Sequence, residues 1–296
     1  MKAAIDIGSN GIRLVIAPIS EHGKLKTFRA PVRLGQDVFE DGYISNKSLS
    51  LLVDALLLFK KKMHASGVTL HKIVATSALR EAKNKRKVVD EVAKKTQLKI
   101  DIIDGHLEAE LIHEAVCEKL NLSHRPTLIM DIGGGSVECI YSMDHKIIDT
   151  ITKKIGTVRL LSKVPKNQRN YSDKWLDIIE KELSEISKYS SLYSTDKSVF
   201  VGTGGNLRAI GKLCKSQGIS KRSDKIKQKH LLELITLLSG LSIKERISNL
   251  GLRSDRADVI LPAALVTEYV MQIYKFKWIK LPDIGLKEGI LNLVSE

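Results

Sequence analysis

Hydrophobic and polar residues alternate in blocks that predict an α/β protein with mixed sheets. Two apolar runs flank a short polar turn in residues 4–16 (AIDIGSNGIRLVI), which predicts a hairpin. Ser45 then precedes a run with helical spacing, whose apolar positions are Leu49, Leu52, Val53, Leu56 and Phe59. Further strands are expected at 72–76, 100–103, 199–201 and 278–281. Helices are expected at 87–95, 107–120, from 172, from 206, over 227–275 with breaks near Gly240, Asn249 and Gly251, and from 285.

The hairpin pattern occurs twice. Residues 129–141 (IMDIGGGSVECIY) again place Asp-Ile-Gly and a turn of small residues between two apolar strands. In both places a turn with a lysine (22–24 and 144–146) and a third strand-like run follow, and then helices and strands alternate. We therefore expect two similar domains, residues 1–122 and 123–296, which face each other across a cleft with both Asp-Ile-Gly turns pointing into it.

Composition excludes several classes of protein. Of the 296 residues, 43% are hydrophobic and 28% are charged, which is typical of a folded soluble chain rather than a disordered one. No apolar run approaches the roughly 20 residues of a membrane span, and Asp6 interrupts the position of a signal peptide. The three cysteines are scattered, which argues against a disulfide framework or a zinc site. We expect a cytoplasmic protein with no membrane partner.

The chain is strongly basic. Lys and Arg number 48 against 34 Asp and Glu, a net charge of +14, which favours an anionic partner. The basic runs at 60–62, 83–87 and 221–230 are candidate contacts for it, of which we favour 83–87 because it lies next to Arg80. No aromatic residue interleaves with these runs, so no nucleic acid is expected. Each run also fits a solvated helix face.

Three glycine-rich turns are suited to phosphate, because residues without Cβ let successive backbone N–H groups approach one anion. The expected phosphate-binding residues are Gly8, Ser9, Asn10, Gly133, Gly134, Gly135, Ser136, Gly202, Thr203, Gly204 and Gly205. The third of these turns precedes a helix, whose N-terminus also favours phosphate. The alternative reading of each turn is a plain connection.

Acidic residues stand beside the first two turns. Asp6 and Asp131 end their strands directly before a turn, and Glu138 begins the strand after the second one. A carboxylate repels phosphate, so its function there would be to hold a divalent metal that bridges to phosphate oxygens. The alternative is that the aspartates only accept hydrogen bonds from turn N–H groups.

At this point the sequence resembles a known family. The segments are DIGSN (6–10), ATSALREAKN (75–84), DIGGGSVE (131–138), GTGGN (202–206), RADVILPAAL (256–265) and GLKEG (285–289). They look like the exopolyphosphatase / guanosine pentaphosphate phosphatase family of the actin–sugar kinase–heat-shock superfamily. The resemblance implies two ribonuclease-H-like (actin-like ATPase) domains and magnesium-dependent release of orthophosphate from the end of polyphosphate. It leaves open guanosine pentaphosphate as substrate, a non-catalytic sensor of polyphosphate or guanosine alarmones, and an ATP-dependent kinase. We also expect a homodimer.

The resemblance adds two catalytic candidates. Glu108 matches the glutamate that activates water in the family, and Arg80 matches an arginine that could clamp phosphate with two hydrogen bonds. An ion pair with a structural carboxylate is the alternative for Arg80. Around Glu108 this chain departs from the family pattern at His106, Leu107 and Glu110, and Asn206 replaces the usual threonine.

Overall fold

The chain forms two compact units in the computed structural model, which describes residues 1–19, 25–165 and 172–294. The first unit is Met1–Ala115 with Gly285–Glu296, and the second is Val116–Ile284. This division differs from the expected one at 122/123, because the C-terminal segment belongs to the first unit. The expected turn at 22–24 lies outside the described residues. The cleft expected between the units stays a prediction.

The first unit contains a mixed five-stranded sheet in the order β3-β2-β1-β4-β5. β1–β2 and β2–β3 pair antiparallel, and β1–β4 and β4–β5 pair parallel. The strands are β1 (Lys2–Gly8), β2 (Gly11–Ala17), β3 (Lys26–Ala30), β4 (Leu70–Ala75) and β5 (Asp101–Ile102). The interior residues of β1 are buried on both faces of the sheet, because helices pack on both faces.

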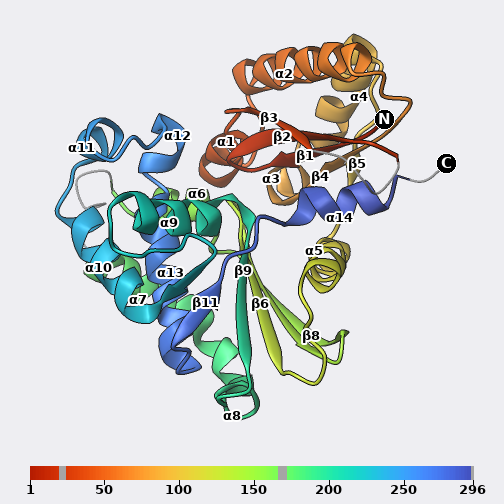
Figure 1. Cartoon of the computed structure of the whole chain (residues 1–296). Coiled ribbons are helices and arrows are strands. Elements are labelled where there is room, and N and C mark those ends of the chain that lie inside the picture. The colour runs from red at the N-terminus through yellow and green to blue at the C-terminus, as the bar shows by residue number, and fades with distance from the viewer. Residues whose placement is uncertain (20–24, 166–171, 295–296) are drawn as a thin grey trace. The chain divides into compact units, whose positions relative to one another are not determined.

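Helices cover both faces of this sheet (Figure 1). On one face, α2 (Asn46–Ala65) joins the core cluster through the apolar residues that the helical spacing predicted. Its N-cap is Ser45, whose hydroxyl accepts a hydrogen bond from the Ser48 amide at 3.1 Å. On the other face, α14 (Leu286–Asn292) packs on β1, β2 and β4. The remaining helices are α1 (Leu34–Asp41), α3 (Ser77–Glu81), α4 (Lys85–Thr96) and α5 (Gly105–Lys119), the last of which crosses the division between the units.

The second unit repeats this topology. Its sheet has the order β10-β11-β9-β6-β7-β8, so that without β10 the strands follow the same order as in the first unit. The strands are β6 (Thr127–Ile132), β7 (Val137–Met143), β8 (Lys146–Lys153), β9 (Val199–Thr203), β10 (Lys225–Lys227) and β11 (Trp278–Lys280). The two antiparallel meanders that continue into parallel strands confirm the internal repeat and the two ribonuclease-H-like domains that the sequence predicted.

Helices of the second unit gather on one face of its sheet, as Figure 1 shows for α9, α10 and α13. The most buried is α13 (Ile260–Ile273), which packs on α7, α9 and α10. The others are α6 (Thr157–Lys163), α7 (Ser172–Leu183), η2 (Ser184–Tyr189), α8 (Ser190–Tyr193), α9 (Gly204–Ser216), α10 (Gln228–Ser239), α11 (Ile243–Ser248) and α12 (Ser254–Ala257). The expected breaks near Gly240, Asn249 and Gly251 are confirmed, since they separate α10, α11 and α12.

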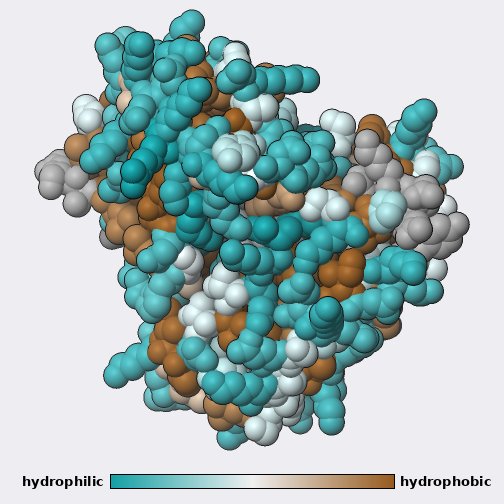
Figure 2. Space-filling view, turned by 180° about the vertical axis from the view of Figure 1, so that it is seen from behind, coloured by the Kyte–Doolittle hydropathy of each residue, from teal (hydrophilic) through white to brown (hydrophobic). Residues whose placement is uncertain are grey.

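The surface agrees with the composition. On the face of the molecule in Figure 2, hydrophilic residues predominate and apolar residues occupy separate smaller areas. Within the described ranges, no helix combines the length and the apolar character that crossing a membrane requires.

Candidate active site

The hairpin β6–β7 brings two carboxylates together in the second unit. Asp131 and Glu138 are directly opposite each other in the antiparallel ladder, so their side chains share one face with Cβ atoms about 5 Å apart. Both residues are buried, Glu138 completely. Burial and the negative charge of Glu138 raise the pKa of the neighbouring Cys139 thiol to about 12. Two carboxylates this close repel each other unless a cation or a proton lies between them.

The third glycine turn contributes to the same place. Thr203 is in register with Asp131 on the neighbouring strand β9, and its hydroxyl lies 2.6 Å from Asp131 Oδ1. The next residue, Gly204, has a φ of +82°, and a Cβ there would lie only 2.7 Å from the same carboxylate oxygen. Glycine is therefore required for the backbone to approach Asp131. The Thr203 hydroxyl thus holds this carboxylate in place, and Gly204 leaves room for it.

The turn between β6 and β7 is oriented by α6. The carbonyl of Gly133 accepts a bond from the Thr157 amide at 3.0 Å, and that of Gly134 accepts one from the Val158 amide at 2.8 Å. The carbonyl of Gly135 accepts a bond from Arg159 Nε at 2.8 Å. In a trans peptide the next N–H points the opposite way, so three successive amides, of residues 134–136, point away from α6. Such a row is the backbone arrangement that binds anions.

Gly156 makes this contact possible. A Cβ at Gly156 would lie 2.3 Å from the Gly135 nitrogen and 2.4 Å from the Gly134 carbonyl carbon. Gly202, in contrast, is in register with Met130 and lies on the opposite face from Asp131. A Cβ at Gly202 would meet the side chains of Ile279 and Leu207 at 2.8 Å. The absence of a side chain at Gly202 therefore serves core packing.

A buried polar network, which the sequence did not reveal, stabilises the turn between β6 and β7. Asn206 donates from Nδ2 to the carbonyl of Ile132 at 3.0 Å, directly before the turn. Its other amide atom, Oδ1, accepts a hydrogen bond from Arg256 Nη1. Asn206 and Arg256 are both buried. The available signal was an arginine next to the apolar segment that becomes α13, since a buried arginine needs acceptors.

The first unit repeats the turn with different chemistry. The carbonyl of Ser9 accepts a bond from the Gly35 amide at 2.9 Å, and that of Asn10 accepts one from Arg29 Nη2 at 2.9 Å. Asp6, however, is opposite Arg13 in the ladder, and Arg13 Nη1 donates to Asp6 Oδ2 at 2.9 Å. A guanidinium thus faces Asp6 at the position where a second carboxylate faces Asp131.

Glu108 lies in the first turn of α5, also in the first unit. The carboxylate of Asp104 accepts a hydrogen bond from the Leu107 amide at 2.9 Å, which caps the helix and lowers the pKa of Asp104. Arg80 Nη1 donates to Glu108 Oε2 at 3.1 Å and to the carbonyl of Ile103 at 2.8 Å. Arg80 therefore orients the buried Glu108 carboxylate, which corresponds to the ion-pair alternative for this arginine. Two of the residues that depart from the family pattern, the exposed His106 and the half-buried Glu110, are paired at 3.2 Å.

The oxygen donors suit a hard divalent cation. Among residues 1–19, 25–165 and 172–294, no group of three or more His, Cys, Asp or Glu side chains could hold a metal ion. Asp131 and Glu138 could offer two carboxylates to such a cation, which would then take its remaining ligands from water and substrate. This is how Mg²⁺ is usually bound, since it keeps several waters and takes one or two protein carboxylates with substrate phosphates.

Comparison with known proteins identifies the class. The profile of the Ppx/GppA phosphatase family matches residues 15–294. The chain belongs to this family, which confirms the resemblance and the expected phosphatase class.

Two relatives cover nearly all of the chain. "Exopolyphosphatase 1" of Mycobacterium tuberculosis is 27% identical over 300 residues, which are 97% of this chain and 86% of the relative. A "putative exopolyphosphatase" of Haemophilus influenzae is 26% identical over 303 residues, 98% of this chain and 90% of the relative.

Solved structures agree in fold. An exopolyphosphatase from Cytophaga hutchinsonii superposes with a TM-score of 0.88 at 23% identity, covering 99% of this chain and 98% of that one. The Aquifex aeolicus member of the Ppx/GppA family has a TM-score of 0.76 at 25% identity, covering 98% of this chain and 95% of that one. The fold class predicted from the sequence is therefore confirmed.

Proposed function

We propose that this protein is an exopolyphosphatase that hydrolyses the terminal phosphate of inorganic polyphosphate and releases orthophosphate. The observation that carries the proposal is the hairpin β6–β7, where the opposed carboxylates of Asp131 and Glu138 lie beside three outward-pointing amides of residues 134–136. The carboxylates suit a cation and the amides suit an anion, which are the two requirements of a bound metal–phosphate group. The names of the mycobacterial and Haemophilus relatives support polyphosphate as the substrate.

Magnesium is the metal that we assign to Asp131 and Glu138. When bound, it would neutralise charge on the phosphate oxygens. Thr203 holds Asp131 at one oxygen, which fixes the direction of the other toward the face that Glu138 shares. The backbone amides of residues 134–136 would donate to the phosphate. The other proposed phosphate contacts stay Gly8, Ser9, Asn10, Gly133, Gly202, Thr203, Gly204 and Gly205. At Gly202 only the backbone could contribute, since Ile279 and Leu207 fill the space that a Cβ would take.

Glu108 is the proposed general base. Hydrolysis requires an oriented water in line with the phosphorus, and little covalent work by the protein. Arg80 holds the Glu108 carboxylate through Nη1, which keeps an acceptor oriented for that water. An arginine carries five N–H donors, so Arg80 can also donate to phosphate in the role that the resemblance implies. The homodimer and the cytoplasmic location stay predictions for light scattering and cell fractionation.

The first test is orthophosphate release from tripolyphosphate, long-chain polyphosphate, guanosine pentaphosphate and ATP, each with magnesium and with EDTA. We expect release from both polyphosphates with magnesium and none with EDTA. Full activity in EDTA would contradict the metal. Faster release from guanosine pentaphosphate than from polyphosphate would make guanosine pentaphosphate the proposed substrate. Release from neither would favour the alternative of a non-catalytic sensor.

The second test is Glu108→Gln, which keeps the size of the side chain and removes the base. Turnover should fall by about 10²–10⁴-fold with substrate affinity nearly unchanged. Glu110→Gln is the matched control, because Glu110 lies on the same helix but pairs with the exposed His106. A Glu108→Gln variant that melts at the wild-type temperature and keeps more than half of the turnover would exclude Glu108 as the base.

A further inference from the structure

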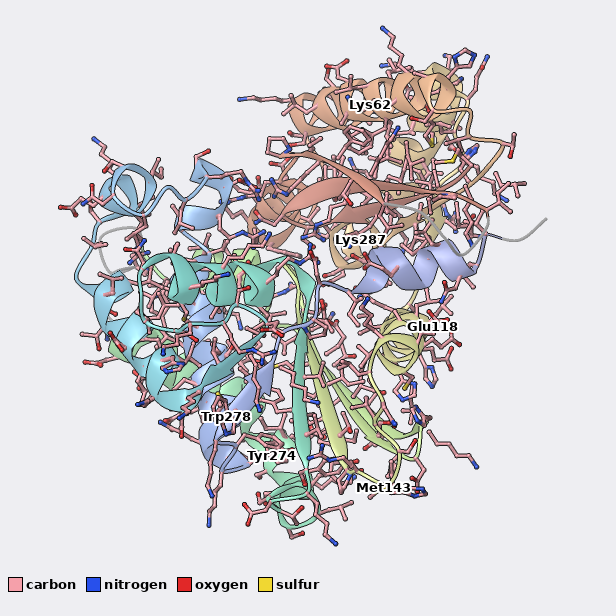
Figure 3. The ribbon with its side chains drawn as sticks, in the orientation of Figure 1. Lys62, Glu118, Met143, Tyr274, Trp278 and Lys287 are labelled. Carbon is pink, nitrogen blue, oxygen red and sulfur yellow. The ribbon has the colours of Figure 1, made fainter. Side chains whose placement is uncertain are left out.

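Four side chains form a basic cluster at the edge of the second sheet. β10 is the edge strand and pairs antiparallel with β11, with Lys225 opposite Lys280 and Lys227 opposite Trp278. Opposed residues and residues two apart share a face, so Lys225, Lys227, Trp278 and Lys280 all point to one side. The intervening Ile226 and Ile279 are fully buried on the other side. We call these four residues the edge cluster, of which Figure 3 marks Trp278.

The edge cluster concentrates the positive charge of three lysines at one edge of the sheet. The two acids nearest in sequence are engaged elsewhere, since Asp224 pairs with Arg222 at 2.5 Å and Asp283 with Arg208 at 2.6 Å. Burial, together with the positive charges of Arg125 and Lys225, lowers the pKa of Lys280. A protonated Lys280 is therefore held among like charges, and an anion bound there would relieve the repulsion.

Trp278 holds two of the lysines in place. The ammonium groups of Lys225 and Lys227 lie 4.3 and 4.8 Å from the centre of its ring, within the range of cation–π contacts. Nucleic-acid sites use such rings to stack bases, but a base would have to displace these lysines first. The arrangement therefore favours a ligand that carries charge without bases.

The edge cluster also shares a sheet face with the proposed active site. Lys280 is in register with Val201 of β9, and Thr203, two residues further along β9, is in register with Asp131. With strands about 4.8 Å apart and a rise of about 3.3 Å per residue, the Cα atoms of Lys280 and Thr203 are about 8 Å apart. Trp278 lies two residues further along β11, away from the turn. The cluster and Asp131 are therefore within the length of one linear polyanion, which would pass outside whatever covers the buried Val201 between them.

We infer that Lys225, Lys227 and Lys280, arranged around Trp278, form a second binding site for the distal phosphates of a long polyphosphate chain. This inference rests on the proposed function, since it concerns the part of the same substrate that is not hydrolysed. The site gives long chains an additional electrostatic contact, whereas a tripolyphosphate is shorter than the distance of about 14 Å between the Cα atoms of Thr203 and Trp278 and reaches fewer of the lysines.

The test compares two triple variants of equal charge change. In the first, Lys225, Lys227 and Lys280 are replaced by glutamine. In the control, Lys60, Lys61 and Lys62 are replaced; Lys62 also lies over an aromatic ring, that of Phe28, at 4.3 Å. The edge-cluster variant should have a KM for long-chain polyphosphate raised about tenfold or more, with kcat unchanged and the KM for tripolyphosphate raised much less. The salt slope of long-chain binding should fall by about two, if about 0.7 counterion is released per lost contact, as for single-stranded polyanions.

A binding measurement separates this inference from the proposed function. Trp175 is fully buried whereas Trp278 is 40% exposed, so a change in tryptophan fluorescence on adding polyphosphate reports on the cluster, and Trp278→Phe should remove it. If the wild type hydrolyses no polyphosphate but this fluorescence change occurs, the proposed function fails and the binding site stands. The inference is overturned if the control variant behaves like the edge-cluster variant, or if tripolyphosphate turnover falls equally. A response to oligouridylate but not to polyphosphate would assign the surface to nucleic acid instead.

Discussion

The two hairpins β1–β2 and β6–β7 share a backbone design and differ at one decisive position. In each, the second turn residue accepts a hydrogen bond from the amide of the second residue of a following helix, and the third accepts one from an arginine. Seven residues after the aspartate, however, the first hairpin has Arg13 and the second has Glu138. The first aspartate is therefore neutralised by the protein itself, and the second stands opposite a like charge.

This difference assigns different functions to the two copies. An ion pair such as Asp6–Arg13 satisfies a buried carboxylate and needs nothing further. Asp131 and Glu138, in contrast, are two like charges in register, so a bound cation would lower their mutual repulsion and would couple charge neutralisation to ligand binding. We therefore propose that the first copy of the repeat mainly stabilises the fold and that the second would provide the metal ligands of the proposed phosphatase.

The largest expected effect follows from copying the first hairpin into the second. Glu138→Arg would place a guanidinium opposite Asp131, as Arg13 lies opposite Asp6. The cation would then be displaced by the protein's own charge, and a metal contributes several kcal/mol of charge stabilisation. We expect turnover to fall on the order of 10³-fold and the response to magnesium to disappear, both measured by orthophosphate release over a magnesium titration.

Because Glu138 is fully buried, the larger arginine can also disturb packing. Glu138→Gln is the isosteric companion and should fold like the wild type. It should raise the magnesium concentration for half-maximal activity by about tenfold or more, in line with the sensitivity of metal sites to lost partners. An unchanged magnesium requirement in a folded Glu138→Gln variant would remove Glu138 from the metal site.

An intermediate effect is expected in the first hairpin, and it concerns stability. Asp6→Asn removes the charge that Arg13 binds at 2.9 Å, so the free energy of unfolding should fall by about 1.5–3 kcal/mol, the range for hydrogen bonds to charged groups. The magnesium requirement should not change, whereas Asp131→Asn should raise it. Denaturant unfolding and the magnesium titration measure the two quantities separately. If Asp6→Asn raised the magnesium requirement as strongly as Asp131→Asn, both hairpins would be metal ligands, as the sequence alone suggested.

The sequence predicted the repeat and most elements because hydrophobic periodicity is local. The pairing of Asp6 with Arg13 was also within reach, since residues seven apart oppose each other across both turns. Two findings were not. The charged run from 221 to 230 contains the strand β10 rather than only helix, because β11, some 50 residues later, provides its hydrogen-bonding partner. Likewise Gly202 serves packing because of Ile279, which no local pattern connects to it.

The boundary between the units shows the same limit. Residues 285–289 (GLKEG) read as the end of the second domain, yet α14 packs on the first sheet. The contact is close, since a Cβ on Gly289 would lie 2.2 Å from the carbonyl oxygen of Leu111. Glycine is therefore required at position 289 by Leu111, which is distant in the sequence. From the sequence alone, Gly289 is only a small residue in a helix.

The smallest expected effect tests how the second hairpin holds its aspartate. Thr203→Val keeps the shape of the side chain and removes the hydroxyl that lies 2.6 Å from Asp131 Oδ1. Two effects would oppose each other. Without the hydrogen bond from Thr203, the Asp131 carboxylate would be a stronger metal ligand, but it would also no longer be held in one orientation. Loss of a residue that orients a metal ligand typically lowers metal affinity or activity by about 10–100-fold. Because Thr203 is only one of the groups around Asp131, we expect the magnesium concentration for half-maximal activity to rise by about three- to tenfold, with a smaller decrease in kcat. Thr203→Ser, which restores the hydroxyl, should recover the wild-type requirement. If Thr203→Val and Thr203→Ser have the same magnesium requirement, the hydroxyl does not orient Asp131, and the difference between the two hairpins lies in Glu138 and Arg13 alone.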